Sequence, residues 1–152
     1  MVTTEYSPQE LLNKAAHYCA QAEHCCQEVR QKVLQWGGDE AAIDTIIAYL
    51  KQNNFIDEQR YAVAFVKDKL RYQGWGRNKI EMMLRQKKVD SSIIHTALEQ
   101  IDEDEYLGIL NKVMASKKRT MKGETKENKI KLIRFLIQRG FLYDEIEEIL
   151  GK

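Results

Sequence analysis

The sequence predicts an all-α protein made of three tandem three-helix repeats that form an elongated, curved array. Three observations lead to this fold class. Apolar residues recur at helical spacing along the chain, strand-like alternation of useful length is missing, and the helical pattern recurs about every 50 residues. The only proline among the 152 residues is Pro8, so proline breaks no later helix.

The composition is that of a folded chain. Hydrophobic residues make up 43% and charged residues 31%, which is enough apolar surface for a core. No stretch approaches the roughly 20 apolar residues of a membrane span, and the N-terminus lacks the pattern of a secretory signal. Cys19, Cys25 and Cys26 are an odd, clustered set that does not indicate a disulfide framework. We therefore expect a cytoplasmic protein that does not contact membranes.

The first predicted repeat, residues 1–55, contains three helices. Residues 7–10, Ser-Pro-Gln-Glu, are a capping-box start for the first helix. The second helix begins at Cys25-Cys26 and ends at Gly37-Gly38, and Asp39 caps the third. Apolar residues recur at helical spacing in these helices: Leu11, Ala15, Tyr18, Ala22, Val29, Val33, Ile43, Ile46, Ile47 and Leu50.

The second predicted repeat, residues 56–102, follows the same plan. Asp57 starts a helix, Gly74-Trp75-Gly76 forms a tight break, a further helix covers residues 77–88, and Asp90 caps the next. The inward residues are Tyr61, Ala62, Phe65, Val66, Leu70, Ile80, Met83, Leu84, Ile93, Ile94, Ala97 and Leu98. Their helical spacing favours a core role for Tyr61 and Phe65.

The third predicted repeat, residues 103–152, differs by a longer connection. A basic, polar loop is expected over residues 116–125 between its first two helices, and Gly140 ends the second helix. The apolar residues of its helices are Tyr106, Leu107, Leu110, Val113, Ile130, Leu132, Ile133, Phe135, Leu136, Ile146, Ile149 and Leu150.

Internal repetition is the most informative feature of the organisation. Residues 79–84 match residues 131–136 at an offset of 52, and an apolar residue follows each, Val89 or Phe141. An offset of 51 aligns the first repeat with the second. Small three-helix units bury little surface alone, so stacking them in a row shares their apolar faces and leaves a long, curved surface.

The net charge of +1 conceals an uneven distribution. Residues 1–52 carry 4 basic and 7 acidic side chains, residues 60–88 carry 9 and 2, and residues 112–139 carry 10 and 2. Two dense basic blocks predict contact with a polyanion or with an acidic protein face. The alternative is that these charges only solvate exposed helix faces.

The segment that starts the second repeat resembles a known family. Residues 55–66, Phe-Ile-Asp-Glu-Gln-Arg-Tyr-Ala-Val-Ala-Phe-Val, are similar to the most characteristic motif of the RecX family, an acidic cap, an Arg-aromatic-Ala triplet and Phe-Val. The glycine break at residues 74–76, the basic helix with Lys79-Ile80 and residues 84–87, and residues 134–141 are also similar to the family. The resemblance covers nearly the whole chain.

The chain departs from the family pattern at four positions. Arg77, Met83 and Lys88 stand where proline, an acidic residue and glycine are usual, and Cys25 stands where a capping serine is common. The resemblance implies a regulator that lies along the helical groove of RecA recombinase filaments on single-stranded DNA. It also implies slower ATP hydrolysis and strand exchange, loss of filaments, and a place in DNA repair and the SOS response.

The candidate contact residues are the clustered cations of the second and third repeats, together with one tryptophan. They are Arg71, Trp75, Arg77, Lys79, Arg85, Lys87, Lys88, Lys117, Lys118, Arg119, Lys129, Lys131 and Arg134. Lys79 and Lys131 match by repeat, which predicts one basic ridge. Trp75 is expected either as an exposed anchor for a partner or base, or as a cap over the helix junction.

No catalytic constellation or cofactor motif stands out, so we expect no enzyme and no cofactor. The His17, Cys19, His24, Cys25 and Cys26 group lacks the paired, close spacing of a zinc site, so we expect no metal. The alternatives to a RecA-filament regulator are a general DNA-binding helical-repeat module and a protein–protein scaffold without nucleic acid. A monomer is expected.

Overall fold

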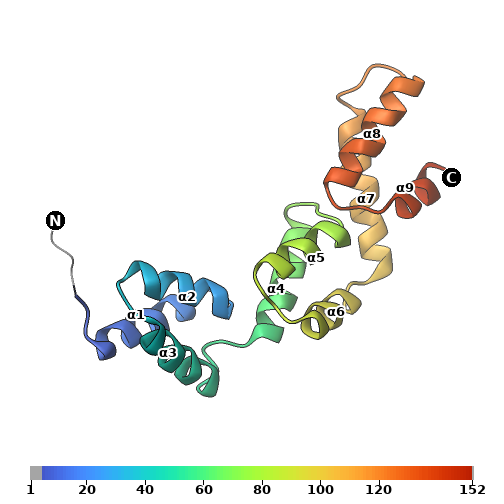
Figure 1. Ribbon diagram of the computed structural model, residues 1–152. Coiled ribbons are helices and arrows are strands. Elements are labelled where there is room, and N and C mark those ends of the chain that lie inside the picture. Colours follow the sequence, from blue (N-terminus) through green and yellow to red (C-terminus); the bar gives the residue numbers. More distant parts are fainter. Residues whose placement is uncertain (1–4, 152) are drawn as a thin grey trace.

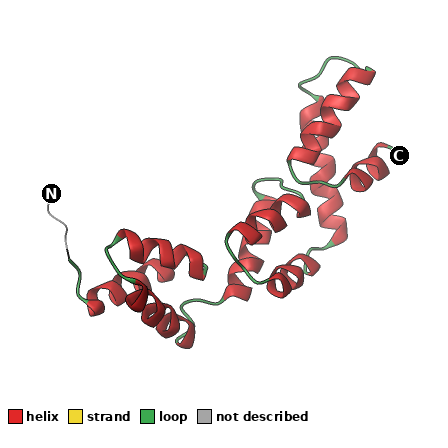
Figure 2. Cartoon of the chain, in the orientation of Figure 1, coloured by secondary structure: helices red, strands yellow, loops and turns green. Residues whose placement is uncertain are grey.

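A computed structural model describes residues 5–151, and over this range the chain consists of helices and loops without a strand (Figure 2). Three units of three helices follow one another in an elongated, bent array (Figure 1). The predicted fold class is therefore confirmed. The predicted limits of the repeats, 1–55, 56–102 and 103–152, stay predictions.

The first unit has its own core. It comprises α1 (Pro8–Gln21), α2 (Cys26–Gln35) and α3 (Glu40–Gln52). As the sequence predicts, Ser7 and Glu10 form a reciprocal capping box with two bonds of 3.1 Å, and Asp39 accepts from the Ala42 amide at 2.9 Å. The buried core residues are Leu11, Ala15, Cys19, Val29, Val33, Ile43, Ile46, Leu50 and Ile56.

The second and third units share one core. Their helices are α4 (Glu58–Arg71), α5 (Arg77–Gln86), α6 (Ser91–Glu99), α7 (Glu103–Lys118), α8 (Lys126–Gln138) and α9 (Tyr143–Leu150). Tyr61 is buried and Phe65 packs partly buried on the same core, which confirms their predicted role. Cys25 belongs to the first unit but is buried in this second core, so it links the two.

Four local predictions need correction. The expected loop over residues 116–125 starts later, because α7 continues to Lys118 and the Lys117 ammonium lies 4.7 Å from the Phe135 ring. The helix expected over residues 77–88 ends at Gln86, because Lys88 adopts a φ of 59°. Asp90 is the N-cap residue of α6, but its carboxylate accepts from the Ser92 hydroxyl instead of a helix amide. Two residues of the predicted helical apolar pattern are exposed, Ile130 at 43% and Ala22 just beyond the end of α1.

The middle helices of the units, α2, α5 and α8, meet head to tail. At the joint between the second and third units, the Gly76 amide donates to the Arg139 carbonyl at 2.8 Å and the Asn78 amide donates to the Gly140 carbonyl at 3.0 Å. The N-terminus of α5 thus rests on the C-terminus of α8. Each helix end supplies partners for the free backbone groups of the other, and the helix dipoles align.

The joint between the first and second units repeats this arrangement with side chains. The side-chain nitrogen of Gln27 donates to the carbonyls of Gln86 and Lys87 at 2.8 and 3.1 Å, and the Cys25 thiol lies 3.9 Å from the Lys87 carbonyl. Gln27 and Asn78 are 51 residues apart, in line with the sequence repeat. Only the N-terminus of α8 has no following unit among the described residues, so this end of the row is open (Figure 1).

Candidate binding surface

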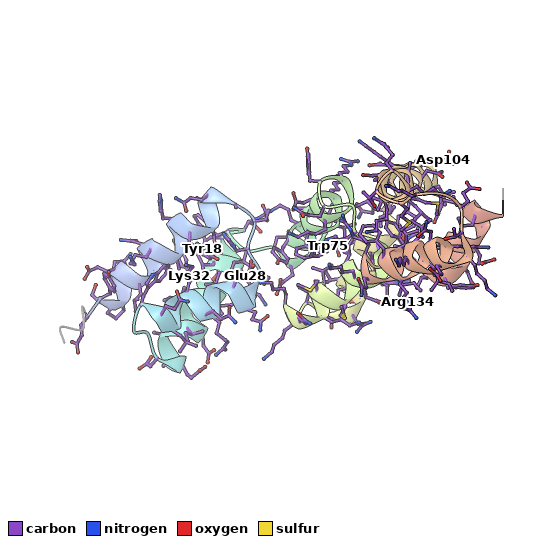
Figure 3. All side chains as sticks on the ribbon, turned by 90° about the horizontal axis from the view of Figure 1, so that it is seen from above. Tyr18, Glu28, Lys32, Trp75, Asp104 and Arg134 are labelled. Atoms are coloured by element: carbon purple, nitrogen blue, oxygen red, sulfur yellow. The ribbon has the colours of Figure 1, made fainter. Side chains whose placement is uncertain are left out.

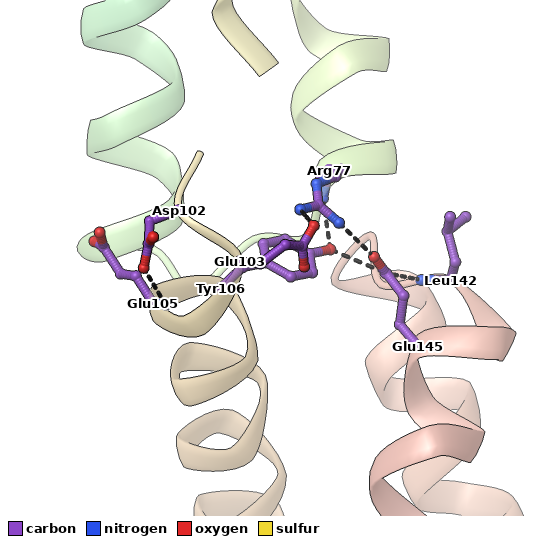
Figure 4. Close-up of polar contacts among 7 residues, drawn as sticks. All are labelled: Arg77, Asp102, Glu103, Glu105, Tyr106, Leu142 and Glu145. Atoms are coloured by element: carbon purple, nitrogen blue, oxygen red, sulfur yellow. Dashed lines mark hydrogen bonds and ion pairs between the residues drawn. The ribbon is translucent and has the colours of Figure 1, made fainter. Parts of the chain in front are cut away.

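One of the candidate contact residues, Arg77, is occupied inside the joint between the second and third units. Its guanidinium pairs with Glu145 at 2.9 Å and with Glu103, and it stacks 3.9 Å from the Tyr106 ring centroid (Figure 4). The Tyr106 hydroxyl accepts from the Arg77 amide at 3.1 Å and donates to Glu145 at 3.0 Å. This network connects α5, α7 and α9, so Arg77 holds two units together.

Three further candidate cations are also paired within the chain. Arg71 bonds to Glu105 at 2.6 Å across the second and third units, and this bond lowers the pKa of Glu105. Lys87 pairs with Glu28 at 3.1 Å across the first and second units. Arg85 pairs with Glu81, one turn earlier on α5, at 3.2 Å. Their charge is therefore partly offset before any partner arrives.

Trp75 is half-buried and packs against the shared core. The ammonium groups of Lys69 and Lys79 lie 5.2 and 4.3 Å from its ring centroid. The indole therefore covers the junction between α4 and α5 while two cations cover the indole. The structure places Trp75 where both of its predicted roles are possible in space, and the contact role stays a prediction.

The remaining candidate cations have no carboxylate within ion-pairing distance among the described residues. They are Lys79, Lys88, Lys117, Lys118, Arg119, Lys129, Lys131 and Arg134. Lys79 and Lys131 match by repeat but lie in different settings. Lys79 is half-buried at the second joint, whereas Lys131 is exposed on α8.

A basic groove lies between the end of α7 and one side of α8, and it encloses about 520 Å³. The charged side chains that line it are four cations, Lys117, Lys122, Lys131 and Arg134. No carboxylate lines the groove. Met121 and the half-buried ring of Phe135 add apolar surface. Figure 3 shows Arg134 projecting from α8 at the outer edge of the third unit.

The loop over residues 119–125 is held in place beside this groove. The Asn128 side-chain nitrogen donates to the carbonyls of Lys122 and Gly123, both at 2.9 Å, and the Thr125 hydroxyl caps α8 by accepting from the Asn128 amide at 3.1 Å. Lys122 is thus presented from an ordered backbone.

Sequence reasoning missed two parts of this surface. Lys122 lies in the predicted loop but was not among the candidates, and Phe135 was expected only as one of the apolar residues of its helix. The joint residues Tyr61 and Tyr106 were expected as core residues, without their polar contacts. One signal was available for them, because each tyrosine lies four residues after a capping aspartate, Asp57 or Asp102.

The cysteine and histidine residues of the first unit do not form a metal cluster. Among the described residues, no group of three or more His, Cys, Asp or Glu side chains is arranged to hold a metal ion. Burial raises the pKa of Cys19 and of Cys26 to about 11, which disfavours the thiolate form that metals bind. His24 instead stacks on Tyr18 at a centroid distance of 3.7 Å and bonds to Glu28 at 3.1 Å.

These features define a tandem helical-repeat protein with end-to-end joints and a basic groove between α7 and α8. Within residues 5–151, no helix has the length and apolar character needed to cross a membrane. Family models match the chain as three successive three-helix domains of RecX, the first at residues 12–50, the second at 57–98 and the third at 103–150. The chain belongs to the RecX family.

Individual relatives agree with this assignment. "Regulatory protein RecX" of Clostridium tetani is 35% identical over 129 residues, which span 83% of this chain and 59% of that protein. The Pectobacterium atrosepticum protein of the same name is 32% identical over 147 residues, covering 95% of this chain and 87% of the relative. The chain thus spans less than two thirds of the clostridial relatives it matches.

Two solved structures share the fold. The crystal structure of RecX from Lactobacillus salivarius superposes with a TM-score of 0.82 at 22% identity, over 95% of this chain and 94% of that one. A second crystal structure, of regulatory protein RecX, gives a TM-score of 0.82 at 21% identity, over 100% and 81%. At these identities the likeness speaks for the fold alone.

Proposed function

We propose that this chain binds the RecA recombinase filament on single-stranded DNA and lowers its ATP hydrolysis and strand exchange. In this way it modulates DNA repair and the SOS response. The proposal is carried by membership of the RecX family, whose curated members are named regulatory proteins. We expect it to act in the cytoplasm by binding and not by catalysis, without a cofactor.

The repeated architecture supports a repeating partner. The middle helices recur at offsets of 51 and 52 residues and follow one another along the array. A filament also presents the same surface again with each subunit, so successive units can engage successive sites. Weak contacts then add through effective concentration, and a rod bound across several subunits restrains their relative movement.

The free cations supply the attraction in this proposal. Arg71, Arg77, Arg85 and Lys87 already have partners within the chain. The contact energy therefore rests mainly on cations without a carboxylate partner, such as Lys79, Lys88 and Lys129. Such contacts speed association and weaken as salt rises.

The test is ATP hydrolysis by RecA on single-stranded DNA, with this protein titrated to less than one copy per RecA. We expect the rate to fall at these ratios. The variant Lys79→Glu/Lys88→Glu/Lys129→Glu is expected to need at least about tenfold more protein for the same effect. A matched control, Lys51→Glu/Lys67→Glu/Lys112→Glu, changes the charge equally on first and third helices and is expected to act like the parent.

The two rival functions give different results. A general DNA-binding module binds single-stranded DNA but leaves the RecA rate unchanged once free DNA is in excess. A scaffold without nucleic acid changes neither quantity. An unchanged rate with the parent protein would overturn the proposal.

A further inference from the structure

We propose that the basic groove between α7 and α8 is a binding site for single-stranded DNA, which engages it directly and without RecA. The groove's chemistry calls for a flexible polyphosphate strand. The choice of DNA over RNA rests on the proposed function.

The charged side chains that line the groove all have the same sign. Lys117, Lys122, Lys131 and Arg134 surround the groove, and no carboxylate lines it. Elsewhere in the array cations of α4 and α5 pair with carboxylates across the joints, as Arg71 does with Glu105. A protein surface usually carries both signs of charge, whereas a nucleic-acid strand carries one negative charge per nucleotide. A lining of a single sign therefore favours the strand over an acidic protein face.

Two apolar side chains, Met121 and Phe135, form the floor of the groove. The Lys117 ammonium lies 4.7 Å from the centroid of the Phe135 ring, and Met121 lies beside it in the lining. A phosphate held by Lys117 brings the adjoining base to this floor. Unpaired bases gain stability by stacking on aromatic rings, while the bases of a duplex are already stacked on each other. The site is thus suited to a single strand.

One residue of the groove, Lys131, occupies a position that lies at a joint in the other two units. Glu28 and Lys79 occupy the positions equivalent to Lys131, and both lie at joints, Glu28 against Lys87 and Lys79 against Gly140. No unit covers this face of α8 within the described chain. The residue at this position in the third unit, Lys131, is exposed and lines the basic groove.

The experiment is fluorescence anisotropy of a labelled 20-nucleotide oligo-dT with the full chain, in the absence of RecA. We expect binding that weakens with salt at a log–log slope of about −3, from about 0.7 per contacted phosphate and four cations. The variant Lys131→Gln/Arg134→Gln is expected to reduce this slope to about −1.5 and to weaken binding at least about tenfold at low salt.

A matched control distinguishes binding in this groove from general attraction of DNA by the positive charge of the protein. Lys112→Gln/Lys126→Gln removes the same charge from α7 and α8 outside this groove, and we expect it to bind like the parent. Equal losses in both variants would overturn the proposal in favour of diffuse attraction. Absence of binding by the parent protein would also overturn the proposal.

Competitors decide the identity of the ligand. Unlabelled oligo-dT should displace the probe, while duplex DNA and a poly-glutamate peptide of equal charge should do so at least about tenfold less well. Better competition by oligo-rU than by oligo-dT would replace DNA by RNA as the ligand, and better competition by poly-glutamate would replace it by an acidic protein. Because RecA is absent from the anisotropy assay, the two experiments are independent. Failure to bind oligo-dT would not affect the ATP hydrolysis test, and an unchanged rate of ATP hydrolysis would not affect the result for oligo-dT.

Discussion

At the residue scale, Lys88 adopts a backbone conformation that suits glycine. Its φ is 59°, and the matching residue of the next unit is Gly140, with a φ of 101°. Side chains in the left-handed region cost about 1–2 kcal/mol, partly returned by the greater freedom of glycine in the unfolded chain. The family resemblance marks this same position as one where glycine is usual, so the departure has a physical cost.

We therefore expect Lys88→Gly to raise the free energy of unfolding by about 0.5–1 kcal/mol, measured by urea denaturation. The control is Lys87→Gly. Residue 87 has a φ of −79°, and the substitution removes the ion pair with Glu28, so the free energy of unfolding should fall. If Lys88→Gly were no more stable than the parent, strain at this residue would be ruled out.

Glu28 gives the first joint a dependence on pH. Burial raises its pKa, but hydrogen bonds from His24, Lys87 and the Cys25 amide outweigh burial, so the net pKa is lowered. A carboxylate with a lowered folded pKa adds stability above its unfolded value of about 4.3, and this stability is lost as the pH falls through the folded value.

The substitution Glu28→Gln should therefore destabilise the protein at about pH 7, and the difference from the parent should shrink as the pH falls below about 4. Urea denaturation at several pH values measures this. Glu124→Gln, on an exposed loop, is the control and should behave like the parent at each pH. A difference that is constant with pH would exclude the ionised pair as its source.

At the element scale, the second joint depends on direct contact between two backbones. A Cβ atom on Gly76 would overlap the Gly140 carbonyl and lie 2.5 Å from the Phe141 nitrogen. The equivalent residue in the first unit is Cys25, whose side chain takes part in a joint closed by side chains. This difference explains why residue 76 is glycine while the equivalent residue 25 carries a side chain.

We expect Gly76→Ala to lower the free energy of unfolding by about 2–3 kcal/mol, because the joint must open to admit the methyl group. Gly108→Ala is the matched control. Gly108 lies within α7 with nothing within 4 Å of an added Cβ, so alanine there should stabilise the helix by about 1 kcal/mol. Thermal denaturation compares the two, and similar effects would show that backbone contact does not close the joint.

The sequence predicts helices well and joints poorly, for physical reasons. Helix starts depend on local capping, and Ser7, Asp39 and Asp57 all cap as expected. Asp90 fails because the Ser92 hydroxyl, two residues away, competes for its carboxylate. The joints connect residues such as Arg77 and Glu145, which are 68 positions apart, and no local pattern reports such a contact.

At the scale of the whole molecule, the charge blocks predict where the basic surface lies but not which charges are free. Arg77 and Lys131 belong to equally basic segments, yet one lies inside a joint and the other faces solvent. The difference arises from position in the array, since only in the third unit does the N-terminus of the middle helix have no other unit packed against it among the described residues. The cations expected to bind partners are therefore those of the groove between α7 and α8, together with Lys79, Lys88 and Lys129.

The most direct test of the central claim is binding of the labelled chain to RecA filaments on single-stranded DNA, held by a nonhydrolysable ATP analogue. We predict that it binds the filament more tightly than free RecA or free DNA. The Lys79→Glu/Lys88→Glu/Lys129→Glu variant should bind at least about tenfold more weakly, and the Lys51→Glu/Lys67→Glu/Lys112→Glu control should bind like the parent. No preference for the filament, or equal binding by both variants, would contradict the claim.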